Sequence, residues 1–392
     1  MTTVQIGLER LVSEERRFLS GRRVGLLCNP VSVDSDFRHA ADLLKDLCAG
    51  GLIRLFGPEH GIRGAAQDMV SVGDALDSDT GLPVVSLYGK DQGSLRPIPS
   101  TLEDLDVLVC DLQDVGSRYY TYVWTALLCL EACSALGVEV LLCDRPNPLG
   151  GVEIEGGRIL PGFESFVGLH DVPTRHGLTI GELVGLAAAE RGAGECLRIV
   201  RMTGWNREMD FEATGRPWVM PSPNMPTLDT AFVYPGMCLV EATSMSEGRG
   251  TTRPFELFGA PGIPPAALAR HMEALSLPGV RFRATWFRPA FQKHAGNDCG
   301  GVQLHVTDRR IFKPLRTALS LLEAVRRIAP EAMSWREAPY EFVSDVPAID
   351  LLAGSTALRE ALASGGGVED VLALWDSEAA AFDERRAPHL LY

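Results

Sequence analysis

The residues best placed to carry out chemistry lie in one short segment, Gly-Pro-Glu-His-Gly at 57–61. The apolar run before it, residues 53–56, predicts a buried strand that the glycine and proline end. Glu59 and His60 then follow the carboxyl end of a strand, where α/β sheets bind ligands, and Arg63 adds a cation. A partly buried glutamate can act as a general acid, and we expect this role for Glu59. The structural alternative is that Glu59 caps a helix and His60 fills a polar corner.

A second polar segment follows another predicted strand at residues 111–122, which read Asp-Leu-Gln-Asp-Val-Gly-Ser-Arg-Tyr-Tyr-Thr-Tyr. Its carboxylates and amides can hydrogen-bond to hydroxyl groups, and its tyrosine rings can stack on a sugar. The binding candidates are His60 from the first segment, then Asp111, Asp114, Arg118, Tyr119, Tyr120 and Tyr122, and finally Asp144 and Asn147 after the next predicted strand. The alternative is that Asp114 caps the following helix and the tyrosines pack beneath it.

A third segment, residues 241–256, mixes acids, hydroxyl groups and arginines between glycines, which is typical of a binding loop. Its candidates are Ser246, Glu247, Arg249, Thr251 and Arg253. Glu247 is the expected catalytic partner of Glu59. Two carboxylates across a cleft, with tyrosines and hydroxyl groups between them, are typical of a glycoside hydrolase. The sequence does not give the distance between the two carboxylates, so the choice between retention and inversion of the anomeric configuration stays open. The alternative for this segment is an exposed interdomain connection.

Elements in a regular order must position these segments. Apolar runs predict strands at 24–28, 53–56, 83–87, 106–111, 138–144 and 197–202, and helical spacing at 37–48, 121–136 and 181–191 separates several of them. This alternation indicates a doubly wound parallel sheet, α/β and Rossmann-like, over residues 1–235. The turn after the first strand reads Asn-Pro-Val-Ser and lacks the dinucleotide fingerprint. Strands at 280–287 and 302–307, with helices at 314–328 and 368–385, predict a smaller α+β domain over residues 236–392 that closes the cleft.

The composition narrows the class of protein. The chain has 392 residues, a hydrophobic fraction of 46% and a net charge of −14, which argues against a nucleic-acid partner. Its nine cysteines form no Cys-x-x-Cys pair and favour a reducing compartment. The N-terminus lacks a signal-peptide pattern and no apolar run is long enough for a membrane span, so we expect a cytoplasmic protein without a membrane partner. A monomer or homodimer is expected.

Other hydrolytic chemistries have weaker support. Acyl transfer by a serine nucleophile usually uses a nucleophile elbow, and the sequence contains no Gly-x-Ser-x-Gly motif. Ser246 beside Glu247 is the alternative candidate for such a nucleophile. A metal-dependent hydrolase could use His60, Asp111 and Asp114, but these residues are dispersed and lack the His-x-x-x-His spacing of a zinc helix. We therefore expect neither a metal nor another cofactor.

Five motifs in order together resemble the bacterial exo-β-N-acetylmuramidases of the NamZ type. They are the segments at 57–61, 111–122, 144–148 (Asp-Arg-Pro-Asn-Pro), 246–252 (Ser-Glu-Gly-Arg-Gly-Thr-Thr) and 390–392 (Leu-Leu-Tyr). The resemblance runs nearly end to end. It implies a Rossmann-like domain and a smaller partner domain with the active site between them. It also implies removal of terminal N-acetylmuramic acid from the non-reducing end of peptidoglycan fragments, with Glu59 at the catalytic acid's position and peptidoglycan-derived saccharides as the partners.

The implied substrate gives the arginines a purpose. N-Acetylmuramic acid carries a lactyl carboxylate, which an arginine can bind through two parallel hydrogen bonds. Arg63, Arg118, Arg249 and Arg253 are the candidates for that contact. Asp114 or Glu247 could orient the nitrogen of the acetamido group if the sugar assists its own departure. A non-catalytic muropeptide-binding protein on the same cleft remains the non-enzymatic alternative.

Overall fold

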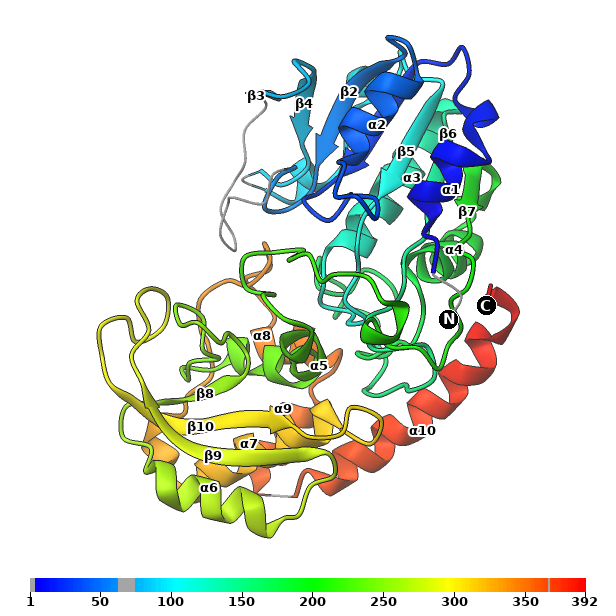
Figure 1. Cartoon of the computed structure of the whole chain (residues 1–392). Coiled ribbons are helices and arrows are strands. Elements are labelled where there is room, and N and C mark those ends of the chain that lie inside the picture. Colours follow the sequence, from blue (N-terminus) through cyan, green and yellow to red (C-terminus); the bar gives the residue numbers. More distant parts are fainter. Residues whose placement is uncertain (1–3, 63–74, 90, 366) are drawn as a thin grey trace.

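The larger domain of the computed structural model is built on a seven-stranded sheet (Figure 1). The structure describes residues 4–62, 75–89, 91–365 and 367–392. The strands are β1 (Val24–Cys28), β2 (Leu52–Gly57), β3 (Ala75–Leu76), β4 (Pro83–Ser86), β5 (Val107–Asp111), β6 (Glu139–Cys143) and β7 (Leu197–Val200), in the order β3-β4-β2-β1-β5-β6-β7. Every neighbouring pair is parallel except β3 and β4. The predicted doubly wound α/β domain is confirmed.

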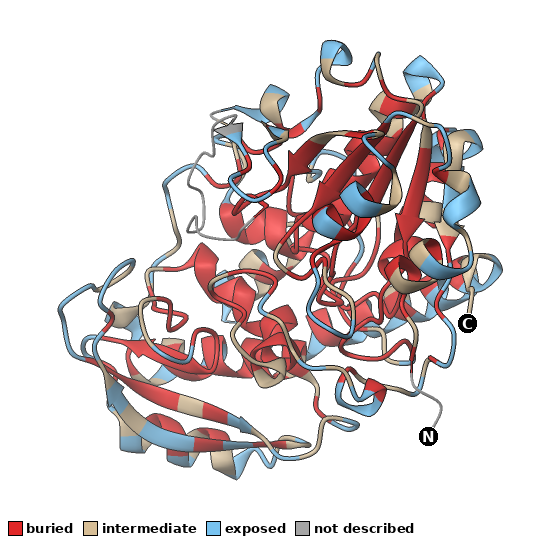
Figure 2. Cartoon of the chain, turned by 45° about the horizontal axis from the view of Figure 1, so that its top comes forward, coloured by how far each residue is buried: buried red, intermediate tan, exposed pale blue. Residues whose placement is uncertain are grey.

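Helices cover both faces of this sheet, which explains why its strands are apolar without alternation. Along β1, Leu26 and Cys28 point into the cluster that holds α1 (Gly7–Ser13) and α2 (Ala40–Leu47). Leu27 between them points into the cluster of the opposite face. That face is covered by two helices, α3 (Tyr122–Leu136) and α4 (Ile180–Arg191). Figure 2 shows these strands buried along their length.

The smaller domain contains a three-stranded antiparallel sheet and most of the remaining helices, which confirms the predicted α+β domain. Its strands are β8 (Leu257–Ala260), β9 (Val280–Phe287) and β10 (Cys299–Val306), in the order β8-β10-β9. Its helices are α5 (Leu228–Met237), α6 (Pro265–Ala274), α7 (Pro314–Ile328), α8 (Ala348–Ala353), α9 (Ala357–Ser364) and α10 (Glu369–Arg386). Figure 2 shows that the edge strand β9 exposes much of its length.

Strand β10 begins three residues before the predicted start at 302, because two glycines let it approach its neighbour closely. A Cβ atom on Gly301 would lie 1.9 Å from the carbonyl oxygen of Phe258 in β8. A Cβ atom on Gly300 would lie 2.2 Å from the carbonyl oxygen of Ile263. The glycines therefore serve the packing of this sheet, since any side chain there would push the backbones apart.

The end of the chain returns to the larger domain. Helix α10 runs from the smaller domain along the side of the molecule to the region of α4 (Figure 1). At its end, the Arg386 guanidinium donates to the carbonyl oxygens of Gly151 and Gly177. The Tyr392 hydroxyl then bonds to Asp144, after β6. Residues 369–392 therefore pack across both domains.

Two further observations concern the boundary and membrane expectations. The predicted domain boundary after residue 235 falls inside α5, a helix that packs against α7. This division of the chain stays a prediction. No helix in the described parts of the chain is long and apolar enough to span a membrane.

Candidate active site

The sheet order places a switch point beside β1. Strand β1 lies between β2 and β5, and the chain winds outward from it in both directions. In open α/β sheets, ligands bind at the carboxyl ends of the strands at such a point. Glu59 and His60 follow β2, Tyr119 and Tyr120 lie between β5 and α3, and Tyr122 is the first residue of α3. Two of the predicted segments are therefore brought together at the carboxyl edge.

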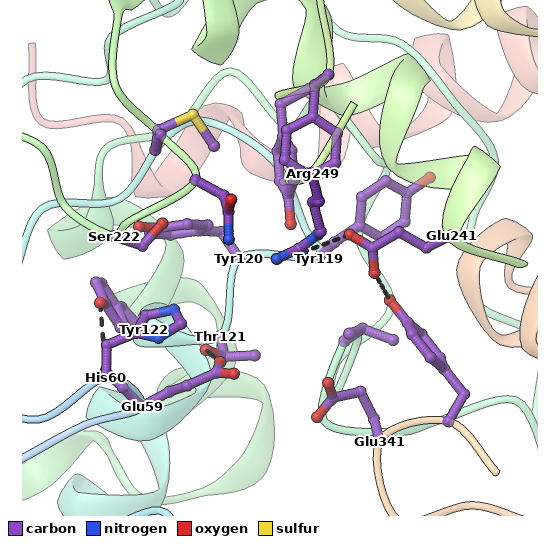
Figure 3. Close-up of a pocket in the computed structure, with 16 residues that line it drawn as sticks. Glu59, His60, Tyr119, Tyr120, Thr121, Tyr122, Ser222, Glu241, Arg249 and Glu341 are labelled. Carbon is purple, nitrogen blue, oxygen red and sulfur yellow. Dashed lines mark hydrogen bonds and ion pairs between the residues drawn. The ribbon is translucent and has the colours of Figure 1, made fainter. Parts of the chain in front are cut away.

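A pocket lies at this edge, between the two domains (Figure 3). It contains about 490 Å³ of empty space when its opening to solvent is included. The larger domain and the connection after it contribute Glu59, His60, Tyr119, Tyr120, Thr121, Tyr122, Val167, Ser222, Asn224 and Met225. The part of the chain from α5 onward contributes Tyr234, Glu241, Arg249, Phe255, Tyr340 and Glu341.

Glu59 is held inside this pocket by a threonine. Its side chain is buried, and the Thr121 hydroxyl donates to Oε2 at 2.9 Å. The neighbouring His60 has a φ of +69°, a conformation that a non-glycine residue rarely adopts. The Tyr122 hydroxyl, beneath this turn, donates to the Pro221 carbonyl oxygen at 2.7 Å. The loop after β2 is therefore shaped to present Glu59 at one place.

Aromatic rings form much of the pocket wall. Tyr120 and Tyr122 pack edge to face with centroids 4.8 Å apart, as do Tyr234 and Phe255 at the same distance. Burial raises the pKa of the Tyr120 and Tyr122 hydroxyls well above the ordinary value, so both stay protonated and can donate. Such a wall offers ring faces and hydroxyl donors to a sugar.

Arg249 and Glu241 form a buried ion pair on the opposite wall (Figure 3). Arg249 Nη2 donates to Glu241 Oε1 at 2.7 Å, and the Tyr340 hydroxyl donates to Oε2 at 2.8 Å. Burial raises the pKa of Glu241, but the charge of Arg249 and these hydrogen bonds outweigh it and hold that pKa below the ordinary value. Glu241 is therefore an anion that fixes Arg249 in the pocket.

The expected partner carboxylate, Glu247, does not line the pocket. Its Oε2 accepts from Lys293 Nζ at 2.9 Å, and its Oε1 lies 3.5 Å from Arg249 Nε. Lys293 also donates to the carbonyl oxygens of Val240 and Met245, and so it holds the backbone before Glu247 in place. The structure therefore places Glu247 behind Arg249.

The other residues of that loop hold its shape. Ser246 Oγ accepts from the Gly248 amide, and the Thr251 hydroxyl donates to the Gly248 carbonyl oxygen. Arg253 pairs with Glu256 at 3.1 Å, with its side chain 46% exposed. None of these three candidates lines the pocket.

Two aspartates at strand ends are bound by protein groups. Asp111 forms a buried bidentate pair with Arg145, at 2.6 and 2.8 Å. Asp144 accepts from the Thr179 hydroxyl, the Gly181 amide and the Tyr392 hydroxyl, all within 2.8 Å. These bonds tie strand ends to their neighbours, and neither aspartate lines the pocket.

Arg118 lies entirely inside the protein. Its guanidinium donates to the carbonyl oxygens of Gly157, Val172 and Leu352, at 2.6 to 2.7 Å. Burial lowers its pKa from the ordinary value. This arginine therefore joins loops of the larger domain to helix α8 of the smaller domain, away from the pocket.

Asp114 and Asn147 shape neighbouring loops. Asp114 Oδ2 accepts from the Gly116 amide at 2.6 Å and lies 3.4 Å from His176 Nε2. Asn147 donates to the Leu178 carbonyl oxygen at 2.9 Å. Arg63, the remaining candidate, lies outside the described residues.

The three residues considered for a metal site go to different partners. Asp111 pairs with Arg145, Asp114 approaches His176, and His60 lines the pocket. Within the described ranges, no three or more histidine, cysteine, aspartate or glutamate side chains are grouped so that they could hold a metal ion.

The sequence did not identify several pocket residues. They are Thr121, Val167, Ser222, Asn224, Met225, Tyr234, Glu241, Phe255, Tyr340 and Glu341. The segment at 221–226, Pro-Ser-Pro-Asn-Met-Pro, carries a usable signal, because prolines at this spacing predict a rigid loop with its polar side chains displayed. Glu341 stands between two aromatic residues with no such signal.

Comparisons with known proteins identify the family. Residues 24–229 match the model described as "Exo-beta-N-acetylmuramidase NamZ, N-terminal", and residues 232–392 match its C-terminal counterpart. The chain belongs to the NamZ family of exo-β-N-acetylmuramidases. It is 43% identical over 389 residues to the peptidoglycan β-N-acetylmuramidase NamZ of Bacillus subtilis, covering 99% of this chain and 91% of that protein.

Two solved structures share the NamZ-family fold. Both are described as DUF1343 family proteins from Bacteroides fragilis. The first has a TM-score of 0.90 and 34% identity, with complete coverage of both chains. The second has a TM-score of 0.78 and 26% identity, covering 100% of this chain and 99% of the other. The resemblance seen in the sequence motifs is therefore confirmed.

Proposed function

We propose that this chain is an exo-acting glycoside hydrolase that releases N-acetylmuramic acid from the non-reducing end of peptidoglycan fragments. The observation that carries the proposal is the buried Glu59 carboxyl group, held by Thr121 in a pocket walled by tyrosines between the two domains. The B. subtilis relative, which is named as acting on peptidoglycan, supports the substrate class.

In this mechanism Glu59 is the general acid. A carboxyl group protonates the oxygen that leaves as the glycosidic bond breaks, because an unprotonated sugar alkoxide is a poor leaving group. Thr121 fixes one carboxyl oxygen, so the proton is offered from a defined position. The aromatic rings of Tyr120 and Tyr122 would contact the sugar beside it.

Arg249 is the arginine that the geometry favours for the lactyl carboxylate. It lines the pocket, whereas Arg118 is committed to three backbone carbonyl oxygens and Arg253 pairs with Glu256 at the surface. A guanidinium carries five N–H donors in a fixed plane, so Arg249 can keep its bond to Glu241 while it binds a ligand carboxylate.

The partners and setting follow the same proposal. Peptidoglycan-derived saccharides are the partners, no cofactor takes part, and the net charge of −14 disfavours nucleic acid. The nine cysteines are all free thiols, which supports a reducing compartment such as the cytoplasm, without a membrane partner. The enzyme would work there as a monomer or homodimer in the recycling of wall fragments.

The test is hydrolysis of a chromogenic β-N-acetylmuramide beside the matching β-N-acetylglucosaminide. The wild type should release the chromophore from the muramide only, and Glu59→Gln should lose about 10²- to 10⁴-fold in kcat/KM on a substrate with a poor leaving group. Glu103→Gln, which removes an exposed carboxylate of the same domain, is the matched control and should match the wild type.

Two outcomes would favour the alternatives. If the wild type releases nothing but still binds the disaccharide in calorimetry, the chain is a muropeptide-binding protein. If a chelator abolishes hydrolysis and added metal restores it, the chain is a metal-dependent hydrolase. The NamZ-type proposal requires that the chelator leave the hydrolytic activity unchanged.

A further inference from the structure

Three carboxylates line the pocket, and only one of them is explained as a catalytic acid. Besides Glu59, they are Glu241 and Glu341. Glu241 is occupied on both oxygens by Arg249 and Tyr340. In the view of Figure 3, Glu341 lies on the side of the pocket opposite Glu59. Glu341 therefore needs an explanation of its own.

The backbone that carries Glu341 is strained. Glu341 and Phe342 have φ values of +46° and +67°, and they are the only consecutive non-glycine residues with positive φ in the described parts of the chain. The tight turn is closed by two hydrogen bonds between Tyr340 and Val343, at 2.9 and 3.0 Å. L-residues adopt this conformation at a cost, and such strain gathers at functional sites.

The strain is concentrated around this pocket more widely. His60 and Phe255, which also line it, have φ values of +69° and +63°. Glu341 thus joins two other pocket residues that the fold holds in an unfavourable backbone conformation. A glycine at 341 would relieve the strain but would remove the carboxylate.

Contacts from both domains fix the turn. On the side of the smaller domain, the Tyr340 hydroxyl donates to Glu241 at 2.8 Å. On the side of the larger domain, the Tyr88 ring packs on Phe342 with centroids 5.8 Å apart, and the Tyr88 hydroxyl donates to Glu341 Oε2 at 3.4 Å. The bond from Tyr88 therefore connects the Glu341 carboxylate to the larger domain.

We propose that Glu341 is the second catalytic carboxylate, whose negative charge stabilises the positive charge that develops on the sugar as Glu59 protonates the leaving oxygen. This inference rests on the proposed function. The bond between C1 and the leaving oxygen breaks with its electron pair on that oxygen, which takes the proton of Glu59. C1 becomes electron-deficient, and a nearby carboxylate stabilises it. Water then supplies a hydroxyl group to C1, and its remaining proton restores the Glu59 carboxyl.

The experiment compares the wild type with Glu341→Gln, which keeps the shape and removes the charge. We expect kcat to fall about 10²- to 10³-fold with KM changed less than threefold, as for other groups that act on charge in the transition state. Asp345→Asn is the matched control, because it removes an exposed carboxylate four residues away and should leave kcat unchanged.

A leaving-group series separates the two carboxylates. Replacing the natural sugar leaving group by a dinitrophenol should restore most of the activity of Glu59→Gln, since an acidic phenol departs without protonation. The same substrate should not restore Glu341→Gln, because C1 still develops positive charge.

The outcomes are distinct. A wild type that hydrolyses the muramide together with a Glu341→Gln variant that keeps kcat within threefold, or raises KM alone, would overturn the inference. An inactive wild type would instead overturn the proposed function. If the glutamine variant fails to fold, Glu341→Asp replaces it: withdrawal of the carboxylate by one methylene should lower kcat at least tenfold, and an unchanged kcat would refute the role.

Discussion

Asp144→Asn should change how stability depends on pH without changing substrate affinity. Asp144 is fully buried after β6, and burial raises the pKa of its carboxyl from 3.8 to about 6, although bonds from Gly181, Tyr392 and Thr179 oppose the rise. The unfolded chain releases this proton near pH 3.8. As the pH rises from about 4 to 6, the folded state therefore binds more protons than the unfolded state, and stability falls.

The magnitude follows from the two pKa values. One unit of pKa is worth about 1.4 kcal/mol, so the rise from 3.8 to about 6 corresponds to about 3 kcal/mol of stability lost between acid and neutral pH. About two-thirds of this change falls between pH 4.5 and 7. The asparagine variant has no titrating carboxyl here and escapes that loss, whatever constant offset the altered hydrogen bonds add.

Urea unfolding followed by tryptophan fluorescence at several pH values measures this difference. The wild-type stability minus that of Asp144→Asn should fall by about 2 kcal/mol between pH 4.5 and 7. The exposed control Asp345→Asn should run parallel to the wild type. Parallel curves for Asp144→Asn would refute the reasoning. A several-fold rise of KM in Asp144→Asn with unchanged stability would show that Asp144 contributes to substrate binding.

Two further substitutions test other parts of the description. Arg249→Lys keeps the charge beside Glu241 but loses the planar guanidinium group. The ratio of kcat/KM for the muramide to kcat/KM for a substrate that lacks the lactyl group should therefore fall about 10- to 100-fold. An unchanged ratio would show that Arg249 does not bind the lactyl carboxylate. Gly236→Ala places a Cβ atom 2.0 Å from the Pro314 carbonyl oxygen, where α5 meets α7, and should lower the free energy of unfolding by about 2 kcal/mol or more, measured by urea denaturation.

The sequence predicted the sheet well because its strands are buried on both faces. Such strands are continuous apolar runs, and the predicted run at 24–28 matches β1 at both ends. Helix α5 was not predicted, since it is apolar all round and contains Pro235 within its span. Its register depends on the close contact of Gly236 with α7, which no local pattern reveals.

The site was predicted in part, for a related reason. Position in the sheet sufficed for Glu59 and the tyrosines, because the carboxyl ends of parallel strands meet at one edge. Glu247 was predicted, but Glu241 lines the pocket instead, because contacts from distant parts of the chain decide which of the two glutamates points into it. Lys293 takes Glu247, and Tyr340 joins Glu241 from 99 residues away. The sequence shows neither partner.

Some carboxylates at this edge of the sheet belong to the candidate active site and others only hold the structure together. The groups that each carboxylate contacts distinguish these two roles. Asp111 faces Arg145, and Asp144 faces Tyr392 from the end of the chain, so both aspartates are bound by protein groups outside the pocket. Glu59 and Glu341 face a shared pocket instead, one from each domain. The pocket lies between the domains, and the end of the chain packs across both of them, so the bond between Tyr392 and Asp144 is one of the contacts that join the domains.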